Sequence, residues 1–146
     1  NTQLQMNLLV QAEPSLPAGT VITVKPHPAC PIRVADYPSL SITVTMEPIA
    51  KLLAECDVAY SSAATSAAID AYCAGVPIVS MLDPNTLNLS PLRGWAGALF
   101  ASTPEELTLA LTSAATTQRT RDDRNEFFTL DPQLPRWRKL ILDSLA

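Results

Sequence analysis

Short apolar segments alternate with helical patterns along most of this chain, and this alternation constrains the fold more than any other feature. Apolar, β-branched-rich runs predict strands at residues 21–25, 41–45, 57–61, 77–82 and 98–101. Apolar strands that are joined by helices are typical of a parallel sheet covered on both faces. Because such crossovers are right-handed, we expect an α/β fold with a Rossmann-like, doubly wound parallel sheet in three α/β/α layers.

Helical spacing of apolar residues fills the intervals between these strands. The pattern predicts helices at residues 2–13, 47–56, 64–74, 104–114 and 135–146. Gly75 is expected to end the third helix as a left-handed cap, and Thr103 with Glu106 forms a capping box around Pro104. No repeat or linker divides the chain, so we expect one domain over residues 1–146 with a helical extension at about 119–146.

Composition limits the classes of partner. The 146 residues are 47% hydrophobic, which suffices for one core, and the net charge of −4 offers no basic face for nucleic acid. No apolar run is long enough to cross a bilayer, and three cysteines without framework spacing are typical of a reducing cytosol. The chain lacks an initiator Met and starts in a helical pattern, so we expect a piece of a longer cytoplasmic protein, which the parent can bring to the inner face of the membrane.

Polar side chains follow two of the predicted strands. Lys25 and His27 lie in a Lys-Pro-His-Pro segment after the first strand, and Ser61, Ser62 and Thr65 follow the third. In an open α/β sheet, ligands bind in the crevice outside the carboxyl ends of the strands. His27 can donate to a phosphate near neutral pH, and Lys25 can add a positive charge. The alternative is a turn histidine hydrogen-bonded to a loop carbonyl.

The hydroxyl-rich segment also opens the third predicted helix, whose first N–H groups and positive dipole end suit a phosphate. Spacing of four is expected to place Ser62, Ser66 and Asp70 on one line, so that the carboxylate can accept from ribose hydroxyls. The alternative is a capped amphipathic helix whose Ser and Asp side chains face water.

Other recognised chemistry is not indicated by the sequence. There is no Walker loop, no dinucleotide fingerprint of three glycines and no nucleophile elbow. His27 and Cys30 lack a second pair at ligand spacing, so neither a metal nor another cofactor is predicted. Arg93, in the loop after the fourth strand, can pair with a phosphate or simply belong to a covering loop.

These motifs, taken in order, resemble a known family. Residues 25–28 (Lys-Pro-His-Pro), 56–62 (Cys-Asp-Val-Ala-Tyr-Ser-Ser), 65–70 and 74–79 (Ala-Gly-Val-Pro-Ile-Val) resemble the C-terminal half of GT-B glycosyltransferases. The similarity is greatest to bacterial sialyltransferases, Kdo transferases and CDP-glycerol glycerophosphotransferases of surface-carbohydrate synthesis, and it covers roughly residues 21–111. The resemblance implies the C-terminal half of a GT-B fold and a CMP- or CDP-linked donor.

The resemblance also implies roles for individual residues. His27 would contact the donor phosphate and assist departure of the nucleotide, while Ser61, Ser62 and Thr65 would hold that phosphate at the helix start. Asp70 stands where many GT-B members have a Glu that binds the ribose, and its shorter arm is a departure from the family pattern. The partner of this half would be an N-terminal domain of the same protein, with the acceptor site. The first strand of the C-terminal half is also expected to be missing, so the isolated domain is expected to be inactive.

Two other functions remain open from the sequence. One is half of a UDP-sugar 2-epimerase, which shares the GT-B architecture but needs further acids and histidines in both domains. The other is a non-catalytic Rossmann-like interaction module, for which no nucleotide binding is expected. A preference for uridine nucleotides would indicate the epimerase, and the absence of nucleotide binding would indicate the interaction module.

Overall fold

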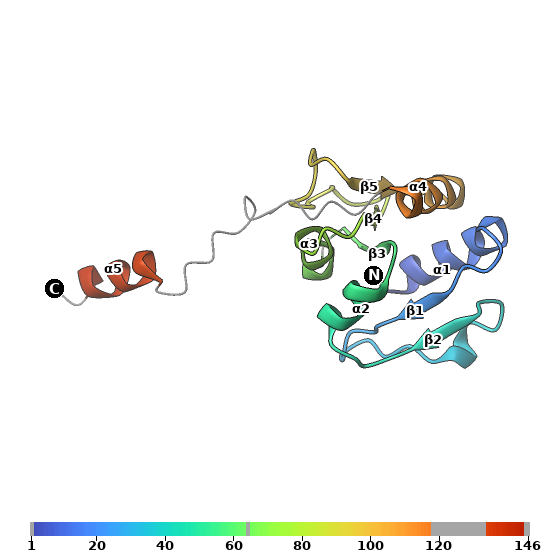
Figure 1. Cartoon of the computed structure of the whole chain (residues 1–146), viewed down its shortest axis with the longest axis horizontal. Helices are drawn as coiled ribbons and strands as arrows, with labels where there is room; N and C mark the ends of the chain where they lie inside the picture. The colour runs from blue at the N-terminus through green and yellow to red at the C-terminus, as the bar shows by residue number, and fades with distance from the viewer. Residues whose placement is uncertain (1, 64, 118–133, 145–146) are drawn as a thin grey trace.

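The computed structural model describes residues 2–63, 65–117 and 134–144 (Figure 1). The α-helices are α1 (Thr2–Ala12), α2 (Ile49–Glu55), α3 (Ser66–Cys73), α4 (Pro104–Thr116) and α5 (Pro135–Ser144). The strands are β1 (Ile22–Val24), β2 (Ile42–Val44), β3 (Ala59–Ser62), β4 (Ile78–Met81) and β5 (Ala98–Ala101), and short 3-10 helices occupy Glu13–Ser15 and Val34–Asp36. The predicted alternation of strands and helices is confirmed in the described residues.

All five described strands run parallel to their neighbours, but they form two small sheets rather than one. β1 pairs with β2, with Ile22 opposite Ile42, and the second sheet has the order β3-β4-β5. No ladder joins β1 to β3. Instead, the backbone carbonyl of Tyr60 in β3 accepts a hydrogen bond from the side chain of Gln5 in α1, with an N–O distance of 3.5 Å. The α/β class with parallel strands is therefore confirmed, and the single continuous sheet is not.

One apolar cluster joins the two sheets. Met6, Leu9 and Ala12 of α1 and Leu107 and Leu111 of α4 belong to it. The cluster also includes Val79 and Met81 of β4. The two-stranded sheet packs against it through Ile22, Val24 and Ile42. Figure 1 shows α1 lying beside both β1 and α4. This cluster is the main physical link between the halves of the fold.

A second cluster lies under α3. Ile78 of β4 packs there with Ala68, Ala71 and Tyr72 of α3 and with Leu92 from the loop before β5. Ile78 and Val79 thus contribute to different clusters, as expected for consecutive residues of a strand. β4 is the central strand of its sheet, and every one of its residues is buried.

The β1–β2 sheet is covered less completely than predicted. Its apolar residues Ile22, Val24, Ile42 and Val44 are only half-buried or partly exposed, and the central Thr23 and Thr43 are exposed. In a strand, successive side chains point to opposite faces, so the threonines lie on the face away from the apolar cluster.

Local signals at the helix ends act as predicted. Gly75 has φ 71°, and the N–H groups of Gly75 and Val76 donate to the carbonyls of Tyr72 and Ala71, each at 3.0 Å, which is a Schellman motif. At α4, the N–H of Glu106 donates to Thr103 Oγ1 at 3.2 Å and the Glu106 carboxylate accepts from the Thr103 N–H at 3.3 Å. This completes the capping box.

Candidate functional site

His27 lies three residues beyond β1, at the carboxyl end of that strand. The N–H of Ala29 donates to His27 Nδ1 at 3.1 Å, and the N–H of Cys30 donates to the His27 carbonyl at 2.8 Å. A neutral imidazole that accepts at Nδ1 bears its proton on Nε2. The turn therefore fixes the tautomer and leaves an exposed Nε2–H donor with no partner in the described part of the chain. As in the alternative interpretation, His27 is a turn histidine hydrogen-bonded within its own loop, but its partner is the N–H of Ala29 rather than a carbonyl.

Lys25 is placed beside the end of β2. Its Nζ donates to the carbonyl of Met46, with an N–O distance of 3.4 Å, and the side chain is exposed. A single long hydrogen bond to a carbonyl leaves the ammonium able to donate to another acceptor. Lys25 and His27 therefore present two donors after the same short strand.

The end of β3 bears the predicted hydroxyl groups. Ser61 is buried, and its Oγ donates to the carbonyl of Ser62 at 3.2 Å. Thr65 is exposed, and its Oγ1 donates to that same carbonyl at 3.2 Å. The Ser62 carbonyl is thus the acceptor that shapes the turn between β3 and α3.

Helix α3 begins at Ser66, with Thr65 as its N-cap. The Thr65 side chain accepts no hydrogen bond from the helix, so its first N–H groups have no side-chain cap. Ser66 is exposed at the first helical position. The prediction that Ser62 lies on one helical line with Ser66 and Asp70 is wrong, because Ser62 is the last residue of β3.

Ser80 is an unusual residue that lies outside the motifs described above. It lies opposite Ser61 in the β3–β4 register and is fully buried, at 0% exposure. Its Oγ has no hydrogen-bond partner among the described residues. A buried hydroxyl without a partner is uncommon because it loses its hydration without compensation. The signal in the sequence is a lone Ser within the apolar strand 77–82.

Asp70 lines an open groove that none of the predicted hydroxyl residues lines, although it lies one turn after Ser66 on α3. It lies on the side of α3 that faces α2, in an open groove of about 550 Å³ whose walls include Leu53 of α2 and Cys73. Its carboxylate makes no hydrogen bond or ion pair with the part of the chain that the structure describes. Cys73 is exposed on this groove.

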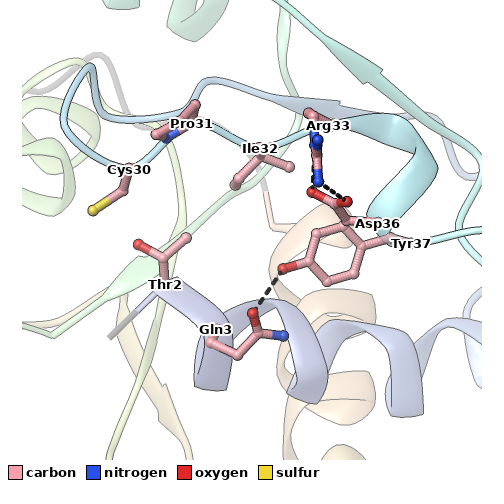
Figure 2. Close-up of a pocket in the computed structure, with 8 residues that line it drawn as sticks. All are labelled: Thr2, Gln3, Cys30, Pro31, Ile32, Arg33, Asp36 and Tyr37. Carbon is pink, nitrogen blue, oxygen red and sulfur yellow. Dashed lines mark hydrogen bonds and ion pairs between the residues drawn. The ribbon is translucent and has the colours of Figure 1, made fainter.

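A second open pocket, of about 540 Å³, lies between the start of α1 and the loop that follows His27 (Figure 2). Thr2 and Gln3 of α1 form one wall, and the segment 30–37 forms the other. Cys30 connects this wall to His27 through the backbone hydrogen bond described above. The sequence does not reveal this pocket, because no pattern in it indicates that α1 packs beside the loop.

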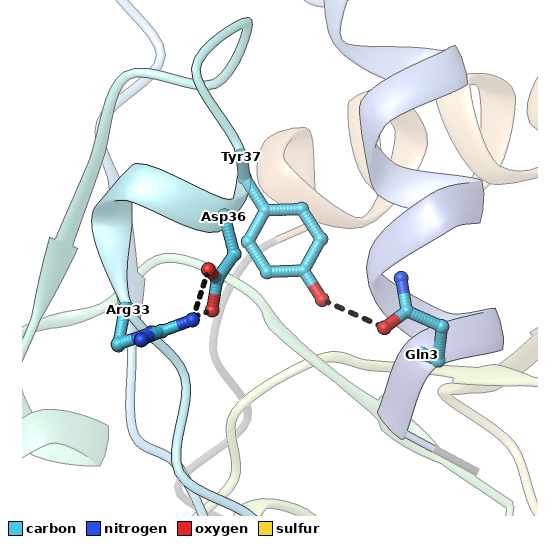
Figure 3. A network of polar contacts seen from close by, with 4 residues as sticks. All are labelled: Gln3, Arg33, Asp36 and Tyr37. Atoms are coloured by element: carbon cyan, nitrogen blue, oxygen red, sulfur yellow. Dashed lines mark hydrogen bonds and ion pairs between the residues drawn. The ribbon is translucent and has the colours of Figure 1, made fainter.

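Two polar contacts hold the wall of this pocket (Figure 3). Nε and Nη2 of Arg33 donate to the two carboxylate oxygens of Asp36 at 3.1 and 2.8 Å. This hydrogen bond, more than the charge attraction, lowers the pKa of Asp36 and raises that of Arg33. The Tyr37 hydroxyl donates to Gln3 Oε1 at 3.5 Å and ties the loop to α1. The Arg33 charge is neutralised by its neighbour, so this wall is polar without being strongly cationic.

The loop between β4 and β5 is organised by its own side chains. Asp83 accepts from the N–H of Asn85 at 2.9 Å, and Asn88 accepts from the N–H of Ser90 at 3.0 Å. Trp95 packs edge-on against Tyr72 of α3, with ring centroids 5.8 Å apart. The loop is thus a cover for α3, and Arg93 is exposed on it.

In the described ranges, no three His, Cys, Asp or Glu side chains are grouped to hold a metal ion. No helix in those ranges has the length and apolar content needed to cross a bilayer. The fold and site define an α/β protein whose parallel strands end in polar turns. No protein-family model, curated protein or solved structure matches the chain.

Proposed function

We propose that this chain is the donor-binding domain of a glycosyltransferase that uses a CMP- or CDP-linked sugar for bacterial surface polysaccharide. The observation that supports the proposal most is the tautomer of His27, whose Nε2–H donor is fixed and exposed at the carboxyl end of β1. Ligands of open α/β sheets bind at these strand ends. The partner would be an N-terminal domain of the same protein, and the site would work on the cytoplasmic side.

The strand order supports a Rossmann-like, three-layer arrangement of GT-B type. A doubly wound sheet has the order 3-2-1-4-5-6. In the proposed fold, the two observed sheets, β2-β1 and β3-β4-β5, would correspond to strands 3-2 and 4-5-6 of that order. In this arrangement the first strand lies between β1 and β3, where the structure has no ladder. The crevice for the donor would then extend across the ends of β1 and β3.

His27 would act on the donor phosphate as a hydrogen-bond donor. When the sugar–phosphate bond breaks, negative charge grows on the phosphate of the departing nucleotide. The Nε2–H of His27 stabilises that charge, and the Lys25 ammonium adds to the same effect. Because the Ala29 N–H fixes the ring, the donor is oriented before the substrate arrives.

The start of α3 would hold the phosphate oxygens. Its first N–H groups have no side-chain acceptor, and the positive end of the helix dipole favours an anion. Ser62 and Ser66 supply hydroxyl donors around this point, and Thr65 would join them by turning its hydroxyl from the Ser62 carbonyl to the phosphate. The buried Ser61 shapes the strand end below it. Asp70 would accept from the ribose hydroxyls at the α2-facing side of α3.

Nucleotide titration of the isotope-labelled chain tests the proposal. We expect saturable amide shifts at residues 25–30 and 61–68, strongest with CMP or CDP and weaker with UDP and GDP. His27→Ala should weaken binding about tenfold, the loss typical of a hydrogen bond to a charged group. Asp70→Asn should reduce the preference for CMP over its 2′-deoxy form.

Ser39→Ala serves as a matched control for Ser66→Ala. Both serines are exposed, but Ser39 precedes β2 and so lies at the opposite end of the strands. Only Ser66→Ala is expected to weaken binding. A preference for uridine nucleotides would favour the epimerase alternative, and the absence of shifts at millimolar nucleotide would contradict the proposal for this chain.

A further inference from the structure

Helix α5 (Pro135–Ser144, red in Figure 1) has an apolar side and a basic side. At 100° per residue, Trp137, Leu140 and Ile141 fall within one sector, because they are three or four positions apart. Arg136 and Arg138 border that sector on its two sides. The helix therefore presents an apolar strip between two guanidinium groups.

The apolar strip is exposed rather than part of a core. The exposed fractions are 62% for Trp137, 59% for Leu140 and 55% for Ile141, and no residue of α5 is buried. Neither apolar cluster of the domain includes a residue of this helix. Large apolar side chains gathered on one exposed face mark an interaction surface.

Positive charge is concentrated in the same ten residues. Arg136, Arg138 and Lys139 are three of the ten Lys and Arg residues of the chain, and Asp143 is the only acid in α5. The chain as a whole has a formal net charge of −4. The helix thus bears a local charge opposite to that of the protein, which matches an anionic surface.

We propose that α5 lies in the interface of a membrane that contains anionic phospholipids. An apolar strip with Trp at its centre can enter the headgroup region, while the arginines at its borders reach the phosphates. At ten residues the helix is about 15 Å long, which fits lying on a bilayer rather than crossing it. The proposal is independent of nucleotide binding.

A membrane fits this surface better than a second copy of the chain. A strip about 15 Å long with three large apolar side chains is small beside the roughly 800 Å² that each partner buries in a stable protein pair. A bilayer needs no complementary shape, and each Lys or Arg near an anionic surface adds to the attraction. The bordering arginines would also meet repulsion from the arginines of an identical helix packed on the strip.

The test is co-sedimentation of the full chain with vesicles of phosphatidylcholine, alone or mixed with phosphatidylglycerol. We expect binding only to the mixed vesicles and its loss at high salt. In a Trp95→Phe background, the emission of Trp137 should shift to the blue on binding. Arg136→Gln and Arg138→Gln should each weaken binding about fivefold.

Two adjacent residues provide the matched comparison. Ile141 belongs to the apolar strip, whereas Leu142 points to the opposite side and is similarly exposed, at 66%. Ile141→Ser should lower vesicle binding about tenfold, and Leu142→Ser should leave it unchanged. Neither substitution removes a buried residue, so folding is expected to be normal in both.

Three results would overturn the proposal. The first is failure to sediment with anionic vesicles at low salt. The second is an equal loss of binding for Leu142→Ser and Ile141→Ser, which would show that the face is irrelevant. The third is a blue-shifted Trp137 emission in the absence of vesicles, with either a dimer in sedimentation velocity or a lower Tm for Ile141→Ser. That result would assign the strip to a second copy or to the protein's own surface.

Discussion

Replacing Ser80 with alanine is expected to stabilise the protein, although the residue lies in the central strand of its sheet. The hydroxyl is fully buried and has no hydrogen-bond partner in the described structure. Burial of an unpaired polar group costs about 1–3 kcal/mol, and alanine removes that cost. The lost packing contacts of one oxygen, at about 0.1–0.2 kcal/mol each, offset part of the gain. The expected net effect is about 1 kcal/mol of added stability.

The change is large enough for calorimetry and urea unfolding. For a chain of 146 residues the entropy of unfolding is about 0.3 kcal/mol/K, so about 1 kcal/mol corresponds to a rise of about 3 °C in Tm. The urea midpoint should rise with an unchanged m-value. Ser80→Val is a poor substitute for this test because added methyl groups overpack a fully buried position.

Two other buried serines provide controls of opposite sign. Ser61 donates to the Ser62 carbonyl, and Ser90 accepts from the N–H of Leu92 at 3.2 Å. Alanine at either position removes a real hydrogen bond and should lower stability by about 1 kcal/mol. If Ser80→Ala lowers Tm as much as Ser61→Ala, then the Ser80 hydroxyl has a partner such as a buried water, and the reasoning fails.

Further predictions concern the core and two groups with shifted pKa values, the Glu106 carboxyl group and the Tyr60 phenol group. Leu107→Ala should cost about 2–5 kcal/mol in urea unfolding, because the side chain is fully buried, whereas Leu109→Ala, 72% exposed on the same helix, should cost little; similar losses would contradict the packing. Hydrogen bonds from Ser102 and Thr103 lower the pKa of Glu106, so the stability that its carboxylate contributes is present above its unfolded pKa and is lost as the pH falls through the folded pKa. The Tm of Glu106→Gln should therefore fall less than that of the wild type between neutral pH and about pH 3. Parallel curves of Tm against pH for the two proteins would refute this. Burial raises the pKa of Tyr60 far above its ordinary range, so the stability that its neutral phenol contributes is present below the unfolded pKa and is lost at higher pH. At neutral pH, Tyr60→Phe should lower the stability by about 1 kcal/mol, because it removes the hydrogen bond to Gln5 of α1. Above about pH 10, thermal unfolding should show that the variant retains more of its stability than the wild type.

Local chemistry explains which parts of the fold could be predicted from the sequence. The β5 strand was predicted with its observed bounds, Ala98–Ala101, because Gly97 and the Thr103–Glu106 capping box limit it on both sides. Gly75 adopts its positive φ because a left-handed residue is needed to end α3. These features depend on residues within one or two turns of each other, so the sequence contains the whole signal.

Features that depend on distant residues were not predictable in the same way. The division into two sheets depends on whether β1 and β3 lie side by side, and the pocket depends on α1 packing beside segment 30–37. The hydrophobic pattern of β1 or β3 does not indicate which strand lies beside it. The prediction for Ser62 was wrong for a local reason. The small residues Ser and Ala that precede Thr65 show no hydrophobic periodicity, so the sequence does not indicate where the strand ends and the helix begins.

The two-sheet arrangement also determines how the fold opens. β1 and β2 form a two-stranded unit with exposed threonines, while β4 is buried throughout. Two-stranded sheets are marginal alone, so amides of Ile22–Val24 should exchange with solvent by local opening, and those of Ile78–Met81 only by global unfolding. His27 follows the weaker unit and Ser66 follows the stronger one. A ligand that contacts both His27 and Ser66 would therefore slow amide exchange in β1 far more than in β4. Its observed affinity would be lowered by the free energy needed to keep the β1–β2 unit closed.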